Sequence, residues 1–100
     1  MGSEYFRNAY RPLLPEVYHY DYGSEAAIAA IDENVACVLA EPVQAESGVT
    51  KPPAGWLQAL RHACNKCGSL LIFDEIQAGF GRTGSLWALS KAGLCRTFYY

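Results

Sequence analysis

The hydrophobic residues of the chain gather in two short apolar runs, each of which is followed directly by an acidic residue. The first run, "VACVLA", leads into Glu41, and the second, "SLLIF", leads into the adjacent pair Asp74 and Glu75. Both runs are rich in aliphatic and β-branched residues and show no regular apolar-polar alternation. This pattern predicts two buried strands, and strands buried on both faces are typical of a parallel sheet.

An amphipathic stretch separates the two runs and predicts a helix over residues 54–66. Its apolar residues follow helical i, i+3, i+4 spacing, and Gly68 is suited to cap its C-terminus. These apolar residues are Trp56, Leu57, Leu60, Ala63, Cys64 and Cys67. A strand, a helix and a second strand in this order predict a βαβ unit over about residues 35–74, with a right-handed crossover. The expected fold class is therefore α/β, with a mostly parallel sheet.

The sequence outside this unit is less regular. Residues 1–15 are expected to be irregular because two prolines restrict the backbone. Residues 16–93 are expected to form the α/β part, in which residues 16–22 are β-prone and Ser24 begins a short helix. A glycine-rich turn, "AGFGRTG", and a further short helix in "SLWALSKAG" follow the second strand.

The two predicted strands place their terminal acids at one edge of the sheet. Parallel neighbours in a βαβ unit end on the same edge, which is where open α/β sheets bind ligands. Carboxylates are costly to bury without a partner. Glu41 and Asp74 are therefore expected to face a ligand crevice. Strand alternation turns Glu75 to the other side, where a structural salt bridge or hydrogen bond is expected.

The composition narrows the class of protein. The chain has 100 residues, 51% hydrophobic and 18% charged, as in a small globular domain or a piece of a larger one. Its formal net charge of −2 gives no basic field for nucleic acid or an anionic membrane. No apolar run approaches the roughly 18–20 residues that span a bilayer, and the N-terminus lacks a hydrophobic signal core. We expect a soluble, cytoplasmic protein without nucleic-acid or membrane partners.

Four cysteines raise the question of a metal site. Cys64 and Cys67 form a C-x-x-C pair beside His62. A structural zinc ion takes about four ligands, and no second pair lies at a suitable spacing. The two thiols are therefore expected to pack on the helix, and no metal site is assigned. A disulfide scaffold is not expected either, because the chain has no secretory signal.

The residues "LLIFDE" also match a Walker B strand, in which a short apolar run is followed by Asp-Glu. An ATPase of this kind needs a G-x-x-x-x-G-K-[ST] phosphate loop, which this chain does not contain. The loop could lie upstream if the chain is a fragment, so an ATPase segment stays open as an alternative. A non-catalytic α/β module that binds a partner or serves as a scaffold is the other alternative.

Two motifs in the correct order resemble a known family. "EPVQAESGV" followed by "PPAGWLQALRHACNKCGSLLIFDEIQAGFGRTGSLWA" is similar to the central part of class III aminotransferases, which include acetylornithine, ornithine and 4-aminobutyrate aminotransferases. The similarity is close over residues 35–90, and "MGSEYFRNAYRPLLPEV" resembles the stretch just upstream in some members. It implies the large domain of a fold type I pyridoxal phosphate enzyme, which moves an amino group from an amino donor to a 2-oxo acid.

The resemblance assigns cofactor-binding roles to three residues after the second strand. Asp74 matches the family carboxylate that pairs with the pyridine nitrogen of pyridoxal phosphate and keeps it protonated, so that the ring withdraws electrons. Ile76 matches the residue against the ring face, and Gln77 matches the residue near the phenolic oxygen. Without the resemblance, Ile76 is interpreted as core packing and Gln77 as the cap of a turn.

The same resemblance places Glu41 and Glu46, in "EPVQAESG", on the substrate side. In several members the acid at Glu46 pairs with an arginine that binds a substrate carboxylate, and releases it when the other substrate arrives. Members commonly have glycine where this chain has Ala45, which alters the loop if that position needs a positive φ. From the residues alone, Glu46 is an exposed loop acid. Arg82 and Thr83 are expected to anchor the glycine-rich turn or a subunit interface, with a solvated loop charge as the alternative for Arg82.

No catalytic residue is assigned within the chain. In the family the lysine that forms the Schiff base follows this segment, and Lys51, Lys66 and Lys91 do not stand in the matching context. The loop that holds the cofactor phosphate precedes it, and the tail over residues 94–100 departs from the family pattern. The resemblance thus implies a fragment, inert alone, of a cytoplasmic enzyme that works as a homodimer with active sites near the interface.

Overall fold

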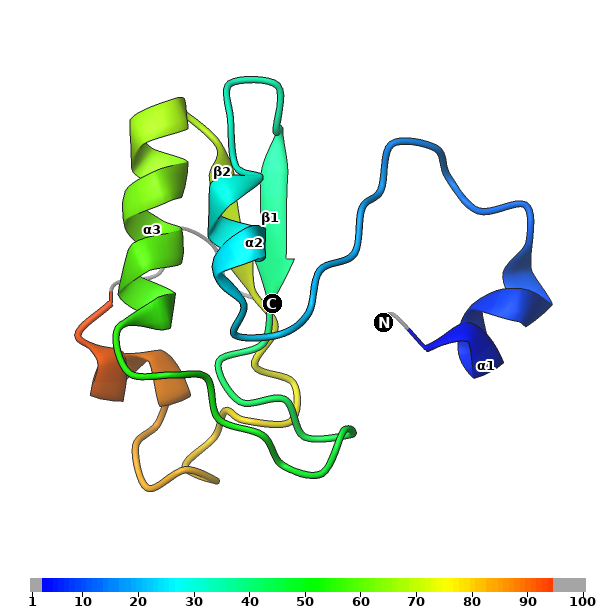
Figure 1. Ribbon diagram of the computed structural model, residues 1–100. Helices are drawn as coiled ribbons and strands as arrows, with labels where there is room; N and C mark the ends of the chain where they lie inside the picture. Colours follow the sequence, from blue (N-terminus) through cyan, green and yellow to red (C-terminus); the bar gives the residue numbers. More distant parts are fainter. Residues whose placement is uncertain (1–2, 95–100) are drawn as a thin grey trace.

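Two strands and five helical segments follow one another along residues 3–94, the part of the chain that the structure, a computed structural model, describes (Figure 1). In chain order they are α1 (Glu4–Arg7), η1 (Asn8–Tyr10), α2 (Glu25–Ala29), β1 (Cys37–Ala40), α3 (Trp56–Cys67), β2 (Leu70–Phe73) and η2 (Ala88–Ala92), where η marks a 3₁₀ helix. No helix in this range is long and apolar enough to cross a membrane. The divergent tail, from residue 95 onward, lies outside the described residues.

The two strands pair in parallel, which confirms the predicted α/β class. Their register places Ala40 opposite Phe73, and α3 connects the strands as the predicted βαβ unit requires (Figure 1). Burial of both faces of the sheet is not found within residues 3–94, since Leu39 and Leu70 remain 48% and 47% exposed. The reason is that α3 packs on the side that carries Leu71 and Phe73, and this segment supplies no comparable cover for the other side.

Helix α3 begins two residues later than predicted. Gly55, which precedes it, has a left-handed φ of 82°, so the right-handed helix starts at Trp56. At the other end, the backbone N–H of Gly68, at a φ of 75°, donates to the Cys64 carbonyl and caps the helix as predicted. The predicted apolar stripe is confirmed, because the buried residues of the helix all belong to it; they are Trp56, Leu57, Leu60 and Cys64.

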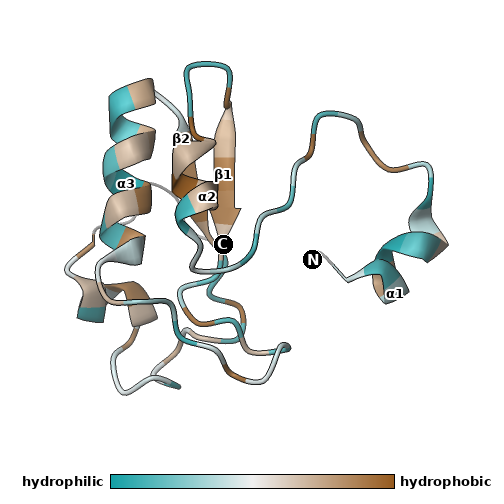
Figure 2. Ribbon diagram, viewed as in Figure 1, coloured by the Kyte–Doolittle hydropathy of each residue, from teal (hydrophilic) through white to brown (hydrophobic). Residues whose placement is uncertain are grey.

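A cluster of buried side chains joins α3, the sheet and η2 into one core. Its members are Ala40, Trp56, Leu57, Leu60, Cys64, Leu71, Phe73 and Leu89. Figure 2 shows the same concentration of apolar residues on both strands. Burial of each leucine in this core contributes about 1.5–3 kcal/mol. Cys64 is completely buried, which confirms the packing role predicted for its thiol, and burial raises the pKa of that thiol.

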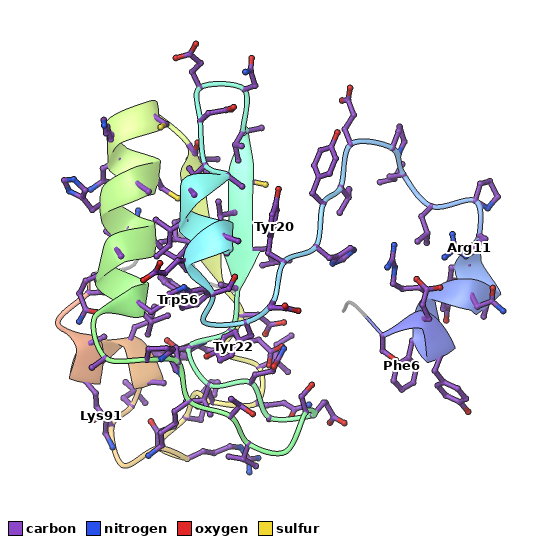
Figure 3. All side chains as sticks on the ribbon, viewed as in Figure 1. Phe6, Arg11, Tyr20, Tyr22, Trp56 and Lys91 are labelled. Atoms are coloured by element: carbon purple, nitrogen blue, oxygen red, sulfur yellow. The ribbon has the colours of Figure 1, made fainter. Side chains whose placement is uncertain are left out.

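Helix α2 is tied to α3 by polar contacts of Trp56. The Ser24 hydroxyl accepts a hydrogen bond from Ala27 N at 3.2 Å and is the predicted N-cap of α2. The Ser24 carbonyl accepts one from Trp56 Nε1 at 2.9 Å. The ring of Tyr22 meets the Trp56 ring edge to face, with centroids 5.2 Å apart (Figure 3). These contacts fix the point at which the chain enters the α/β body.

Residues 3–20 form an arm that stands apart from that body (Figure 1). The expectation of irregular structure over residues 1–15 is wrong for residues 4–10, which form α1 and η1. Glu4 holds these turns together by pairing with Arg7 at 3.0 Å and with Arg11 at 2.7 Å. The β-prone residues 16–22 form no strand, because no neighbouring strand lies alongside them within the described part of the chain.

Candidate functional site

The acids that end the two strands lie side by side. Asp74 N donates a hydrogen bond to Ala40 O at 2.9 Å, so the parallel ladder continues one step past β2. Glu41 directly follows Ala40, and the side chains of both acids are half-buried. Glu41 and Asp74 therefore share the carboxyl edge of the sheet, as predicted.

The carboxylate of Asp74 is oriented by the backbone that follows it. Its Oδ1 accepts a hydrogen bond from Ile76 N at 3.0 Å, which closes an Asx turn. Among residues 3–94 no hydrogen bond reaches its other oxygen, Oδ2. Ile76 is 76% exposed, so the interpretation of this residue as core packing is wrong for the described part of the chain. The turn thus presents a fixed carboxylate and a bare apolar side chain next to each other.

Gln77 joins this turn to the loop that carries Glu46. Its Nε2 donates a hydrogen bond to Glu46 Oε1 at 2.9 Å, across 31 positions of sequence. Glu46 lies in a loop closed by a two-way backbone pair between Gln44 and Thr50, at 2.9 and 2.8 Å. The alternative of Gln77 as a simple turn cap is set aside, because the amide bonds to a distant loop. The structure therefore brings together all five residues named for the cofactor and substrate sides.

The loop tolerates Ala45. The left-handed residues of this loop are Gly48, at a φ of 90°, and Val49, at a φ of 56°. Ala45 is not among the residues with positive φ, so the replacement of the family glycine places no strain at this position. The strain falls instead on Val49, whose β-branched side chain rarely adopts this conformation.

Glu75 faces away from this edge, as predicted. Its side chain is 1% exposed, and Oε2 accepts a hydrogen bond from Ala88 N at 2.7 Å. Oε1 accepts a longer one from Leu89 N at 3.4 Å. The acid binds the free N–H groups at the start of η2, which confirms the structural hydrogen bond expected for it.

Tyr22 is a site residue that the sequence analysis did not identify. Its hydroxyl donates to the backbone carbonyl of Glu41 at 3.0 Å and so fixes the start of the substrate-side loop. Burial raises the pKa of Tyr22 to about 12, and the nearby charge of Glu41 adds to the shift. No sequence signal marks this contact, because it depends on the path of the chain between residues 22 and 41.

The glycine-rich turn is anchored by a lysine and not by Arg82. The Lys91 ammonium donates to the carbonyl of Thr83, whereas the side chain of Arg82 is exposed. Within the described chain Arg82 therefore does not anchor the turn, and its role at a subunit interface stays a prediction.

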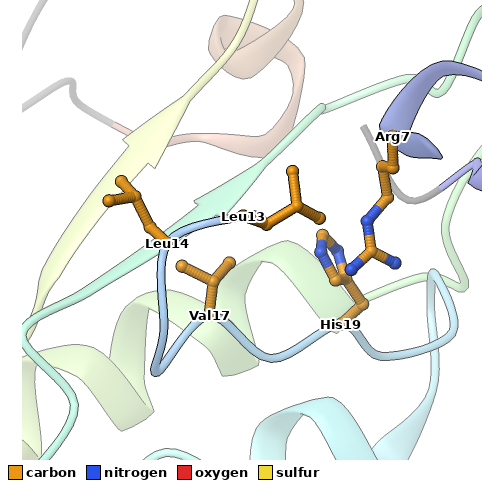
Figure 4. Close-up of a pocket in the computed structure, with 5 residues that line it drawn as sticks. All are labelled: Arg7, Leu13, Leu14, Val17 and His19. Carbon is orange, nitrogen blue, oxygen red and sulfur yellow. The ribbon is translucent and has the colours of Figure 1, made fainter. Parts of the chain in front are cut away.

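A hollow of about 210 Å³ lies elsewhere, in the arm (Figure 4). Its lining residues are Arg7, Leu13, Leu14, Val17 and His19. It contains none of the acids at the sheet edge, and Arg7 is already paired with Glu4. The sheet edge is therefore the candidate site.

This edge offers an oriented carboxylate, an amide donor and two further acids, a set suited to a cationic nitrogen and a polar ligand. The chain matches the profile of the family described as Aminotransferase class-III over residues 8–95. It is 50% identical over 84 residues to an acetylornithine aminotransferase of Methanopyrus kandleri, covering 83% of this chain and 22% of that protein. It is 48% identical over 84 residues to ornithine aminotransferase 2 of Staphylococcus aureus, covering 83% of this chain and 21% of that protein.

The fold agrees with these sequence matches. The solved ornithine aminotransferase of Toxoplasma gondii superimposes with a TM-score of 0.86 at 36% identity, covering 93% of this chain and 23% of that one. The chain thus spans less than a quarter of the length of each of these proteins.

Proposed function

The chain belongs to the class III aminotransferase family, and we propose that its sheet edge forms the cofactor-ring and loop portion of a pyridoxal phosphate site. Pyridoxal phosphate is the cofactor of this family. When bound, it supplies an electron-poor ring that stabilises the negative charge left as an amino substrate loses its α-proton.

The observation that carries the proposal is the geometry of Asp74. A ring nitrogen that must stay protonated needs a fixed carboxylate at hydrogen-bond range. Asp74 is half-buried at the end of β2, its Oδ1 is held by Ile76 N, and its Oδ2 accepts no hydrogen bond from the described residues. Asp74 can therefore accept a hydrogen bond from the protonated ring nitrogen of the cofactor through Oδ2.

The neighbouring residues fit the rest of the ring and the substrate side. Ile76 exposes an apolar side chain that can pack on a ring face, and Gln77 carries an amide donor suited to a phenolic oxygen. Glu41 and Glu46 carry negative charge at the loop, where Glu46 can neutralise an arginine in the absence of a substrate carboxylate. We assign these four residues the roles that the family resemblance gives them.

We further propose that the protein that carries this segment exchanges an amino group between a small-molecule amino donor and a 2-oxo acid. We propose that this protein is a cytoplasmic homodimer without nucleic-acid or membrane partners. The Schiff-base lysine is assigned to none of Lys51, Lys66 and Lys91. Lys91 is already bonded to the Thr83 carbonyl, and Lys66 lies in the last turn of α3. The 100 residues alone are therefore expected to be inert.

The two alternatives are less well supported. An ATPase accounts only for "LLIFDE", whereas the family match runs from residue 8 to residue 95. A non-catalytic module has no need of an oriented, half-buried carboxylate such as Asp74 beside Gln77 and Glu46.

The experiment replaces Asp74 with alanine in the protein that carries this segment. Cofactor absorption is followed after addition of L-ornithine or N-acetyl-L-ornithine. We expect the rate of this half-reaction to fall by at least about a hundredfold in Asp74→Ala. Glu33→Ala, which removes an exposed acid ahead of β1, is the matched control and should react like the wild type. Unchanged turnover in Asp74→Ala would overturn the proposal.

A further inference from the structure

Within residues 3–94, the hydrogen bond between Gln77 and Glu46 is the one side-chain hydrogen bond that joins the turn after β2 to the loop over residues 44–50. Both side chains are exposed, so burial in a core does not force them together. Gln77 stands on a turn whose backbone is bonded to Asp74, and Glu46 lies in the loop closed by Gln44 and Thr50. The bond therefore connects two separately fixed segments.

The chemistry of the pair sets the orientation of the amide. An ionised carboxylate can only accept hydrogen bonds, so Gln77 must turn its NH₂ group toward Glu46. One N–H is used at 2.9 Å, and the second N–H and the amide oxygen stay available for a ligand. Because the acceptor is charged, the bond is of the stronger, charge-assisted kind.

We infer that Gln77 is the positioning residue of Glu46, so that the turn on the cofactor side holds the loop on the substrate side through this hydrogen bond. The inference rests on the proposed function in one respect: that function identifies the turn as the cofactor side and the loop as the substrate side. The mechanical coupling between the turn and the loop does not depend on the cofactor, and can be measured without it.

The first readout uses the protein that carries this segment, freed of cofactor. Hydrogen–deuterium exchange of the backbone over residues 44–50 is compared between the wild type and Gln77→Ala. We expect several-fold faster exchange of this loop in the variant, because its attachment to the turn is lost. Gln58→Ala is the matched control: its Nε2 donates to the Ala92 carbonyl at 2.8 Å, away from the loop, and its loss should leave loop exchange unchanged.

A donor–acceptor exchange tests whether the hydrogen bond itself is responsible. Gln77→Glu places a second carboxylate against Glu46 and should loosen the loop at least as much as Gln77→Ala. Adding Glu46→Gln to Gln77→Glu reverses donor and acceptor, and should return loop exchange toward the wild-type rate. Wild-type exchange in Gln77→Ala, or no recovery in the exchanged pair, would overturn the inference.

The third readout concerns substrate, with 2-oxoglutarate as the probe. Gln77→Ala and Glu46→Ala should each lower KM for the probe about three- to tenfold, because an arginine that Glu46 no longer neutralises is free for the substrate carboxylate, and the double variant should lower it no further than the larger single effect. Additive effects, or an unchanged KM in both single variants, contradict a positioning role. Loss of the cofactor half-reaction in Asp74→Ala tests the proposed function alone, so the two ideas can fail separately.

Discussion

The buried carboxylate of Glu75 accepts a hydrogen bond from the backbone N–H of Ala88 at 2.7 Å, and a longer one from Leu89 N. This contact fastens the start of η2 to the residue that directly follows Asp74 in the chain. The two adjacent acids of "LLIFDE" thus have different tasks: Asp74 is oriented toward the sheet edge, and Glu75 holds the structure behind it.

Replacing Glu75 with glutamine should destabilise the protein. The variant keeps the side-chain volume but replaces one acceptor oxygen with an NH₂ group, which faces a backbone N–H and removes a charge-assisted bond. We expect the free energy of unfolding to fall by about 1–3 kcal/mol, measured by chemical denaturation. Glu33→Gln removes an exposed acid and serves as the control. Equal stability of the two variants would contradict the role of Glu75.

Much of the sheet edge could be predicted because its signals are local. The apolar run of β2 and the helical stripe of α3 are repeated patterns of burial, and a strand-helix-strand order fixes which ends meet. Alternation along β2 also predicts that Asp74 and Glu75 face opposite sides. These expectations depend on neighbours along the chain, and they are confirmed.

Other features depend on contacts between distant residues, which no local pattern records. The bonds of Tyr22 to Glu41 and of Gln77 to Glu46 join segments 19 and 31 positions apart. The arm differs from what its sequence suggests for a related reason. Residues 16–22 have β propensity, but a strand forms only where a partner strand is present. The exposed Ile76 shows the same limit, since apolar character alone does not distinguish a core residue from one that is exposed in this segment.

Gly79 should not tolerate a side chain. A Cβ at this position would lie 2.8 Å from the Glu75 carbonyl oxygen and 2.9 Å from the Trp87 ring. Gly79→Ala is therefore expected to lower the free energy of unfolding by about 1–3 kcal/mol or more, since the backbone on one side cannot move freely. The measurement is again chemical denaturation.

Gly81→Ala is the comparison for Gly79→Ala. A Cβ there meets nothing within 4 Å, and only the positive φ of 82° opposes it. Its cost should be about 1–2 kcal/mol, from backbone strain alone. A Gly79→Ala variant that is more stable than Gly81→Ala would show that the turn relaxes around the new methyl group.

Truncation of Leu60 should open a cavity in the core. This side chain is 1% exposed and packs among α3, β2 and η2. Leu60→Ala is expected to cost about 2–5 kcal/mol in the free energy of unfolding, seen as a lower denaturation midpoint. Leu86→Ala removes the same atoms from a side chain that is 63% exposed and should cost much less. Similar losses in both variants would place the core elsewhere.

The raised pKa of Tyr22 predicts a pH dependence of stability. Burial, with the charge of Glu41 beside it, raises the pKa of this phenol to about 12 in the folded state, from 10.0. Because the unfolded chain loses the proton first, the stabilisation is fully present below about pH 10 and is lost as the pH rises toward about 12. The side chain is only half-buried, so solvent screening limits the loss to about 1 kcal/mol.

Tyr22→Phe should remove this part of the pH dependence, together with the hydrogen bond to the Glu41 carbonyl. Unfolding free energies of the wild type and Tyr22→Phe, measured from pH 8 to pH 11, should therefore converge with rising pH, whereas the exposed Tyr18→Phe should run parallel to the wild type. A constant difference between wild type and Tyr22→Phe over this range would mean that Tyr22 contributes its hydrogen bond but no titration.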